Sequence, residues 1–244
     1  MVGFTYAGFH AVFVVPALVA LAVVASRRRG DPRQVVRALP FFAIVLLALV
    51  YTTPWDNYLI HRGVWWYGEG TVAGRLWLAP IEEYLFILLL PIVATLWLAI
   101  VSTSFEWPDD AITMTVPDRS LGVLAGIAVG TVGLAMLTRD ATYYMGAILA
   151  WAGPVLALQW AVGWSYLLAR WRLVAVGTLV PAMYFAVADR IAIEEEIWTI
   201  SERYTTGLAV GGLPIEEGAF FLVTTLFVVQ GIVLYPWVIE RWQQ

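Results

Sequence analysis

Long runs of residues without a charged side chain constrain this chain more than any other feature. A helix needs about 20 apolar residues, with a range of roughly 17–25, to cross a bilayer. Without water in the bilayer core, runs of this length satisfy their backbone hydrogen bonds only as helices. The sequence therefore predicts an all-α, polytopic membrane protein with about seven transmembrane helices. The seven runs are Phe4–Ala25, Ala38–Trp55, Tyr84–Phe105, Ser120–Thr138, Ala141–Ala169, Leu173–Ala188 and Gly218–Ile239.

Composition agrees with a membrane protein and excludes several kinds of site. Only 13% of the residues are charged, against about 25% in soluble proteins. A chain without cysteine has no disulfides, no thiol catalysis and no Cys-ligated metal. The histidines, His10 and His61, do not have metal-ligand spacing, and no phosphate-binding glycine motif is present. We therefore expect no metal and no cofactor. A net charge of −4 offers no basic face to nucleic acid.

All 14 basic residues are arginine. A retinal-binding rhodopsin also has seven helices, but its Schiff base needs a lysine amine. A chain without lysine cannot form that link, so the rhodopsin interpretation is excluded.

The arginines also predict how the chain crosses the membrane. The side that receives the loops after helices 1, 3 and 5 holds nine of them: Arg27, Arg28, Arg29, Arg33, Arg37, Arg119, Arg170, Arg172 and Arg241. The opposite side holds five: Arg62, Arg75, Arg139, Arg190 and Arg203. Positively charged loops favour the cytoplasmic side. We therefore expect a cell-membrane protein with its N-terminus outside and its C-terminus in the cytoplasm.

The chain contains an internal repeat. The motif PIEE occurs at 80–83 and again at 214–217, and Asp56 and Trp65 recur at one common offset as Asp189 and Trp198. Three helices plus one connecting helix return the chain in the same orientation. The two units are therefore predicted to be parallel repeats, related by an axis along the membrane normal.

This repeat divides the chain into three parts. We expect a first three-helix repeat at 1–106, a loop and linker helix at 107–140, and a second three-helix repeat at 141–244. The linker helix carries Gly122, Gly126 and Gly130. Small residues at this spacing predict a seam of close contact with another helix.

The glutamate pairs of the two motifs, Glu82–Glu83 and Glu216–Glu217, have two interpretations. Pro80 and Pro214 before them suit ordinary helix starts, where acidic residues complement the helix dipole. However, apolar residues lie on both sides, and ionisable groups within a span usually face a bundle interior or a cavity. We therefore expect a functional site. Because successive helical residues lie about 100° apart, only one glutamate of each pair can point straight inward.

Carboxyl groups that converge in an apolar site share protons. Desolvation and mutual repulsion both disfavour ionisation, so some groups stay protonated near neutral pH. A carboxylic acid beside a carboxylate is the equipment of general acid–base catalysis. Asp56 and Asp189, expected at helix ends, are candidate partners, although a salt bridge from Asp189 to Arg190 is an equal alternative. The run Glu194–Glu196 has no counterpart in the first repeat and is expected to be a solvated loop face.

Several tryptophans fall at the ends of predicted spans, where an aromatic belt is expected. Trp65 and Trp198 differ from the others because they repeat. An aromatic face beside a developing cation stabilises it, so a belt role and a site role both stay open for these two. The tryptophans at span ends are Trp55, Trp65, Trp66, Trp77, Trp198 and Trp237.

Duplicated P-x-E-[E/D] motifs at the head of membrane helices, with an upstream Asp and Trp, resemble the non-flavin membrane lycopene cyclases. The resemblance covers essentially the whole length and looks like the form in which two three-helix subunits are fused. It implies a lycopene β-cyclase of carotenoid biosynthesis, an isomerase that needs no cofactor. Its substrate, lycopene, lies in the lipid bilayer.

The same resemblance implies a mechanism. An acid protonates the terminal double bond of lycopene, the neighbouring double bond attacks the resulting tertiary cation, and a base removes a ring proton. Water must be kept out of the cavity, because it would quench the cation. We expect Glu82 and Glu216 to face inward as acid or base, with Glu83 and Glu217 tuning or sharing the proton. Which glutamate donates is left open.

Two other functions remain as alternatives. A proton-coupled transporter can also be built from parallel repeats with membrane carboxylates, although these glutamates lie near helix starts and no broken helix is obvious. A carotenoid hydratase would use the same protonation but admit water.

Overall fold

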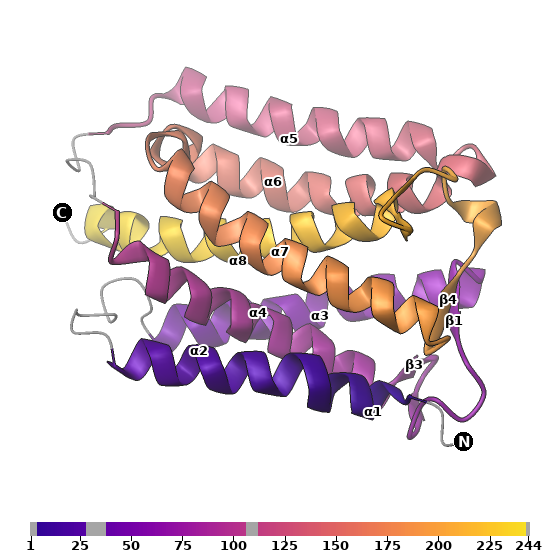
Figure 1. Cartoon of the computed structure of the whole chain (residues 1–244). Coiled ribbons are helices and arrows are strands. Elements are labelled where there is room, and N and C mark those ends of the chain that lie inside the picture. The colour runs from indigo at the N-terminus through magenta and orange to yellow at the C-terminus, as the bar shows by residue number, and fades with distance from the viewer. Residues whose placement is uncertain (1–3, 28–37, 106–111, 243–244) are drawn as a thin grey trace.

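In the part of the chain that the structure describes, seven helices are long and apolar enough to cross a membrane (Figure 1). The computed structural model describes residues 4–27, 38–105 and 112–242. The first span, Tyr6–Arg27, joins α1 (Tyr6–Phe9), a π-helical turn (His10–Val14) and α2 (Val15–Arg27). The other spans are α3 (Ala38–Arg62), α4 (Ile81–Ser102), α5 (Val116–Met136), α6 (Tyr143–Ala169), α7 (Trp171–Glu194) and α8 (Ile215–Trp242). The predicted all-α multi-pass fold is confirmed, and the chain is a multi-pass membrane protein.

Short strands gather at one end of the helical bundle (Figure 1). Strands β2 (Arg75–Leu76) and β3 (Ala79–Pro80) form a hairpin before α4, and β5 (Ala209–Val210) and β6 (Leu213–Pro214) form a matching hairpin before α8. Strand β1 (Trp65–Tyr67) pairs with β4 (Trp198–Ile200) in antiparallel fashion. Short 3-10 turns cover Asp140–Thr142 and Glu202–Tyr204. The loop arginines Arg28, Arg29, Arg33 and Arg37 lie outside the described residues.

The pairing of β1 with β4 joins the two repeats symmetrically. Trp66 lies opposite Thr199, its own counterpart at the offset that relates Trp65 to Trp198. On either side, Ser201 N donates to Val64 O at 2.8 Å and Gly68 N donates to Ile197 O at 3.0 Å. The same offset exchanges these two hydrogen bonds. A local two-fold axis therefore passes through the strand pair and relates the repeats.

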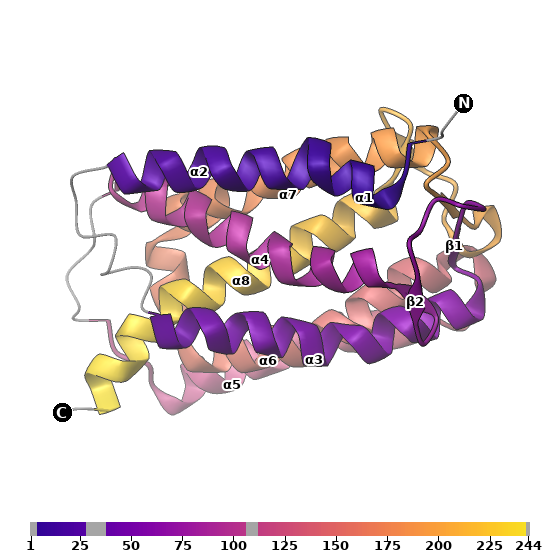
Figure 2. The same cartoon turned by 90° about the horizontal axis from the view of Figure 1, so that it is seen from below.

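The helices that carry the glutamate pairs occupy the centre of the bundle. Figure 2 shows α4 and α8 between α2 and α7 on one side and α3 and α6 on the other. Helix α5 lies outside and packs on α6. A Cβ atom added at Gly122 or Gly126 would collide with the backbone of Trp160 or Ala157. The linker glycines therefore permit close helix contact, as predicted.

Several helix ends differ from the sequence-based expectation. Helix α3 continues past Trp55 to Arg62, and α7 continues past Ala188 to Glu194. Asp56 and Asp189 therefore lie inside helices rather than at their ends. A buried carboxyl side chain does not interrupt the backbone hydrogen bonds of a helix.

Helix α4 begins at Ile81, ahead of the charge-free run that starts at Tyr84, because residues 75–80 form a hairpin whose last residue, Pro80, is the N-cap.

Two clusters of buried apolar side chains fill the interior. One lies near the strands and contains Phe86, Phe185 and Phe221. The other lies toward the opposite end and contains Trp237, which is 2% exposed and packs on Tyr166 with ring centroids 5.0 Å apart. The expectation that Trp237 belongs to an interfacial belt is therefore wrong, because its indole is enclosed by neighbouring helices.

Candidate active site

The two hairpins deliver both glutamate pairs to one end of the bundle. Glu82 and Glu83 lie in the first turn of α4, and Glu216 and Glu217 lie in the first turn of α8. Each helix begins where its hairpin closes: Ile81 N donates to Gly74 O at 3.0 Å, and Ile215 N donates to Leu208 O at 3.1 Å. Both glutamate pairs therefore lie at helix starts. A helix start and a buried position nevertheless coexist here, because the loops fold back over the helix ends.

The first glutamate of each pair holds its preceding loop. Glu82 Oε1 accepts a hydrogen bond from Ala73 N at 2.8 Å, and Glu216 Oε1 accepts one from Thr206 N at 2.7 Å. Both side chains are buried. They do not line the pocket that faces the repeat axis. The expectation that Glu82 and Glu216 are the inward-facing members is therefore not what the structure shows.

The second glutamate of each pair lines a pocket between the repeats. Glu83 and Glu217 share it with Asp56 and Asp189, so each repeat contributes one aspartate and one glutamate. The pocket has a volume of about 50 Å³, which holds on the order of three waters. We call it the acidic pocket. Aromatic side chains and Ile200 supply the rest of its wall: Tyr6, Phe9, Trp55, Trp65, Tyr67, Phe86, Tyr144, Trp198, Phe220 and Phe221.

Asp189 belongs to this pocket rather than to a salt bridge. Its Oδ1 accepts a hydrogen bond from Trp198 Nε1 at 2.9 Å. The neighbouring Arg190 turns away to Glu194, at 3.2 Å, and to Gly211 O. The side chains of Glu194 to Glu196 are exposed, as predicted. Oδ2 of Asp56 and Oδ2 of Asp189 contact no hydrogen-bond donor among the described residues.

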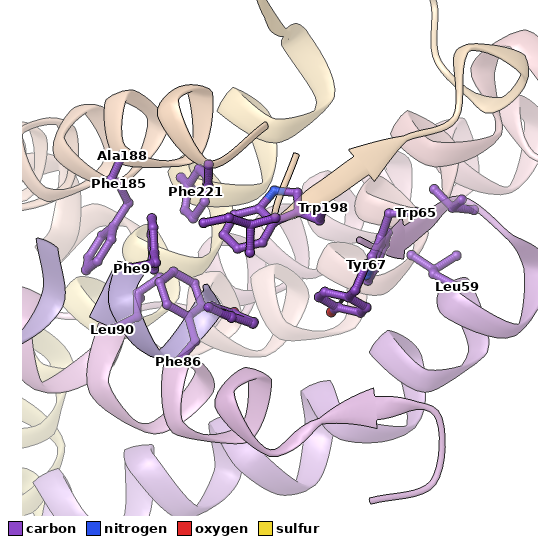
Figure 3. Close-up of a cluster of buried hydrophobic side chains, with 14 of the residues drawn as sticks. Phe9, Leu59, Trp65, Tyr67, Phe86, Leu90, Phe185, Ala188, Trp198 and Phe221 are labelled. Atoms are coloured by element: carbon purple, nitrogen blue, oxygen red, sulfur yellow. Dashed lines mark hydrogen bonds between the residues drawn. The ribbon is translucent and has the colours of Figure 1, made fainter. Parts of the chain in front are cut away.

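The repeated tryptophans form part of the pocket wall. Trp65 and Trp198 are both buried, whereas Trp66 and Trp77 are exposed at the same end of the molecule. Figure 3 shows Trp65, Tyr67 and Trp198 near one another, beside a group of phenylalanines. Trp65 and Trp198 line the acidic pocket. Pro80 and Pro214 do not line the pocket and instead close the two hairpins.

Tyrosine hydroxyls contact the pocket glutamates. Tyr6 and Tyr67 both donate to Glu83 Oε2, at 2.9 and 2.8 Å. Trp65 Nε1 in turn donates to the Tyr67 hydroxyl at 3.2 Å. In the second repeat the Tyr144 phenol lies close to the carboxyl group of Glu217, and Oε1 of Glu217 has no partner in the described chain.

Tyr67 lies outside the membrane-spanning segments and remains a neutral donor. Burial raises the pKa of its phenol well above the ordinary value, and the nearby charges of Glu83 and Asp56 raise it further. Its proton is therefore retained across the physiological pH range and stays directed at Glu83.

Sequence reasoning missed these tyrosines. Tyr6 and Tyr144 are separated by the same interval as Pro16 and Pro154, so alignment of the first helices of the two repeats would have found them. Tyr67 had no such signal, because its counterpart is Ile200. In residues 4–27, 38–105 and 112–242, no group of three or more His, Asp or Glu side chains is arranged to hold a metal ion.

Comparison with known proteins identifies similar chains. A family model described as lycopene cyclase matches residues 5–101 and again residues 140–236. A lycopene beta-cyclase of Halobacterium salinarum is 54% identical over 239 residues, which cover 98% of this chain and 99% of that protein. A bifunctional lycopene cyclase/phytoene synthase of Blakeslea trispora is 30% identical over 92% of this chain and 38% of its own length. No solved structure matches the chain significantly.

Proposed function

The chain belongs to the lycopene cyclase family and is an enzyme of that kind, and we propose that it forms β-rings at the ends of lycopene in the acidic pocket. The observation that carries this proposal is the convergence of Asp56, Glu83, Asp189 and Glu217 from two repeats inside an aromatic wall. The product rings are those of γ-carotene and β-carotene.

Ring formation needs a proton donor and a base in a site without bulk water, and the acidic pocket offers carboxyl groups within an aromatic wall. A carboxyl proton adds to the terminal double bond and leaves a tertiary cation. The neighbouring double bond attacks that cation, which closes the ring with one new carbon–carbon bond and moves the positive charge into the ring. A carboxylate then removes a ring proton and a double bond forms. One proton enters and one leaves, so the product is an isomer and no net redox change occurs.

Differences between the repeats support separate roles for the two pocket glutamates. Glu83 accepts two phenol hydrogen bonds on one oxygen, and hydrogen bonds donated to a carboxylate favour its ionised form. We assign Glu83 as the base. Glu217 lies close to one tyrosine and has an oxygen without a donor among the described residues. It is assigned as the acid that holds the transferable proton.

The other predicted site residues support these two. Asp56 and Asp189 line the same pocket as Glu83 and Glu217 and share the proton with them. Glu82 and Glu216 position the loops over the pocket. Pro80 and Pro214 fix where α4 and α8 begin. Trp65 and Trp198 offer aromatic faces to the cation, an interaction worth about 2 kcal/mol or more in a desolvated site.

We also propose how the chain is divided and how it is oriented in the membrane. Residues 1–106 and 141–244 are the two repeat units and residues 107–140 connect them. The acidic pocket then lies toward the outer face, with the N-terminus outside and the C-terminus cytoplasmic, as the arginine distribution favours. Lycopene and the surrounding lipid are the partners of the enzyme.

Pigment analysis tests the proposed function. The gene is expressed in cells that accumulate lycopene, and the pigments are separated and weighed by mass spectrometry. β-Ring products with the same mass as lycopene are expected. Lycopene that persists unchanged beside folded protein would overturn the proposal, and products heavier by one water would identify a hydratase instead.

A further inference from the structure

A second cavity adjoins the acidic pocket. It has a volume of about 460 Å³, within the range of about 300–1,000 Å³ that is usual for ligand sites. It lies between α3, α4, α6 and α8. Most of its wall is apolar, including Ala48, Leu90, Pro154 and Val228. We call it the tail cavity.

Two aromatic side chains stand between the two cavities and line both. Phe86 of α4 and Phe220 of α8 line both of them. From Phe220, the wall follows α8 as far as Gly231, which is about 16 Å along the helix. The tail cavity therefore leads from the carboxyl groups toward the other face of the membrane.

The tail cavity also has a route from the lipid. Leu47 on α3 and Leu158 on α6 line it and are 64% and 66% exposed. In a membrane these side chains face acyl chains. An apolar molecule can therefore reach the cavity between α3 and α6 without passing through water.

We propose that the tail cavity binds the polyene chain of the carotenoid while its end group reacts in the acidic pocket. This inference rests on the proposed function, because it takes the substrate to be a long apolar polyene. The acidic pocket alone is too small for an end group, so Phe86 and Phe220 turn aside when substrate binds. The polyene then fills the space that leads away from the carboxyl groups.

The matching space on the other side of α4 and α8 is filled with aromatic rings. Phe185 on α7 corresponds to Thr52 on α3, by the same offset that relates Asp189 to Asp56. Phe185 is fully buried, with its ring centroid 5.4 Å from that of Phe86 and 6.1 Å from that of Phe221. Figure 3 shows these rings together with Phe9. The polyene therefore takes the α3–α6 side, and one end reacts at a time.

Two substitutions in α3 test this inference. Ala48→Phe places a ring in the tail cavity, about 12 Å along the helix from Asp56. Thr52→Phe introduces the phenylalanine that the second repeat has at the equivalent position. Ala43→Phe is the matched control, since Ala43 lies on the exposed face of the same helix and does not line the cavity. Each protein is assayed with lycopene and with a truncated analogue that has the same end group but ends before Thr52.

The expected result is selective. Both cavity variants should convert lycopene at least about tenfold more slowly, a usual effect of steric exclusion from an apolar pocket. They should keep their activity on the truncated substrate, and the control should convert both substrates. Unchanged lycopene conversion in both cavity variants, or equal loss of both substrates in both variants, would overturn the inference. If the unmodified protein fails to cyclise lycopene at all, the proposed function itself is wrong.

Discussion

The first repeat surrounds its glutamate with two tyrosine hydroxyls, whereas the second repeat offers one. Tyr67 donates to Glu83, but its counterpart Ile200 cannot donate to Glu217. The backbone around the two sites is nevertheless symmetrical, since Ala73 and Thr206 make the same hydrogen bond to Glu82 and Glu216. Duplication thus preserved the framework, while the side chains that surround the reacting groups diverged.

The apolar surroundings differ in the same way. Thr52 leaves space beside α4 on one side, and Phe185 fills the matching space on the other. Two equal sites would each bind one end of a symmetrical substrate. We propose instead that the pair forms one site with an acid, a base and one place for the polyene.

The largest change in stability is expected on the filled side. Phe185→Ala removes a fully buried ring and should lower the free energy of unfolding by about 3–5 kcal/mol. Thr52→Ala, at the matched open position, should cost about 1 kcal/mol, a typical value for a single substitution. Thermal unfolding of the purified proteins in detergent measures both. Equal losses would contradict the difference in packing.

A smaller effect is expected when the extra tyrosine donor is removed. Tyr67→Phe keeps the ring and deletes the hydrogen bond to Glu83. A hydrogen bond to a charged group contributes about 1.5–3 kcal/mol, so the rate of ring formation should fall roughly 10- to 150-fold. Tyr204→Phe is the control, because Tyr204 lies outside the pocket. Activity of Tyr67→Phe equal to that of the control would show that Glu83 is not held by this phenol.

The smallest effects are expected at the loop-holding glutamates. Glu82→Gln and Glu216→Gln retain an oxygen that can accept the backbone N–H of Ala73 or Thr206. Ring formation should therefore change by no more than a few-fold, because about 1 kcal/mol corresponds to roughly a factor of five. Initial rates with lycopene measure this. A loss of activity as large as that expected for Glu217→Gln would show that Glu82 and Glu216 take part in catalysis directly.

The fold and the motif residues could be predicted because charge is scarce in this sequence. Each charge-free run marks a helix, and each PIEE copy stands out against apolar neighbours. The direction of each glutamate could not be predicted, since it depends on where the helix begins. Because a hairpin occupies the residues before it, α4 begins at Ile81, and with this start Glu83 points into the pocket and Glu82 toward the loop.

Contacts that depend on the pairing of the two repeats could not be predicted from the sequence either. Tyr67 reaches Glu83 through a strand that pairs with the other repeat, and no spacing along the chain encodes that pairing. Trp237 was expected at the interface because it lies near the end of a span. Its burial follows from the packing of α6 against α8.

We propose that Glu217 donates a proton to the terminal double bond and that Glu83 removes a different proton from the ring, and the products of Glu83→Gln and Glu217→Gln distinguish the two roles. Both proteins are given lycopene, and every pigment formed is identified by mass and absorption spectrum. Glu217→Gln should leave lycopene unreacted, with the rate lowered about 10²- to 10⁴-fold by loss of the general acid. Glu83→Gln should still form the cation and release hydrated or misplaced-double-bond products. The same outcome for both variants, or by-products from Glu217→Gln alone, would contradict the assignment.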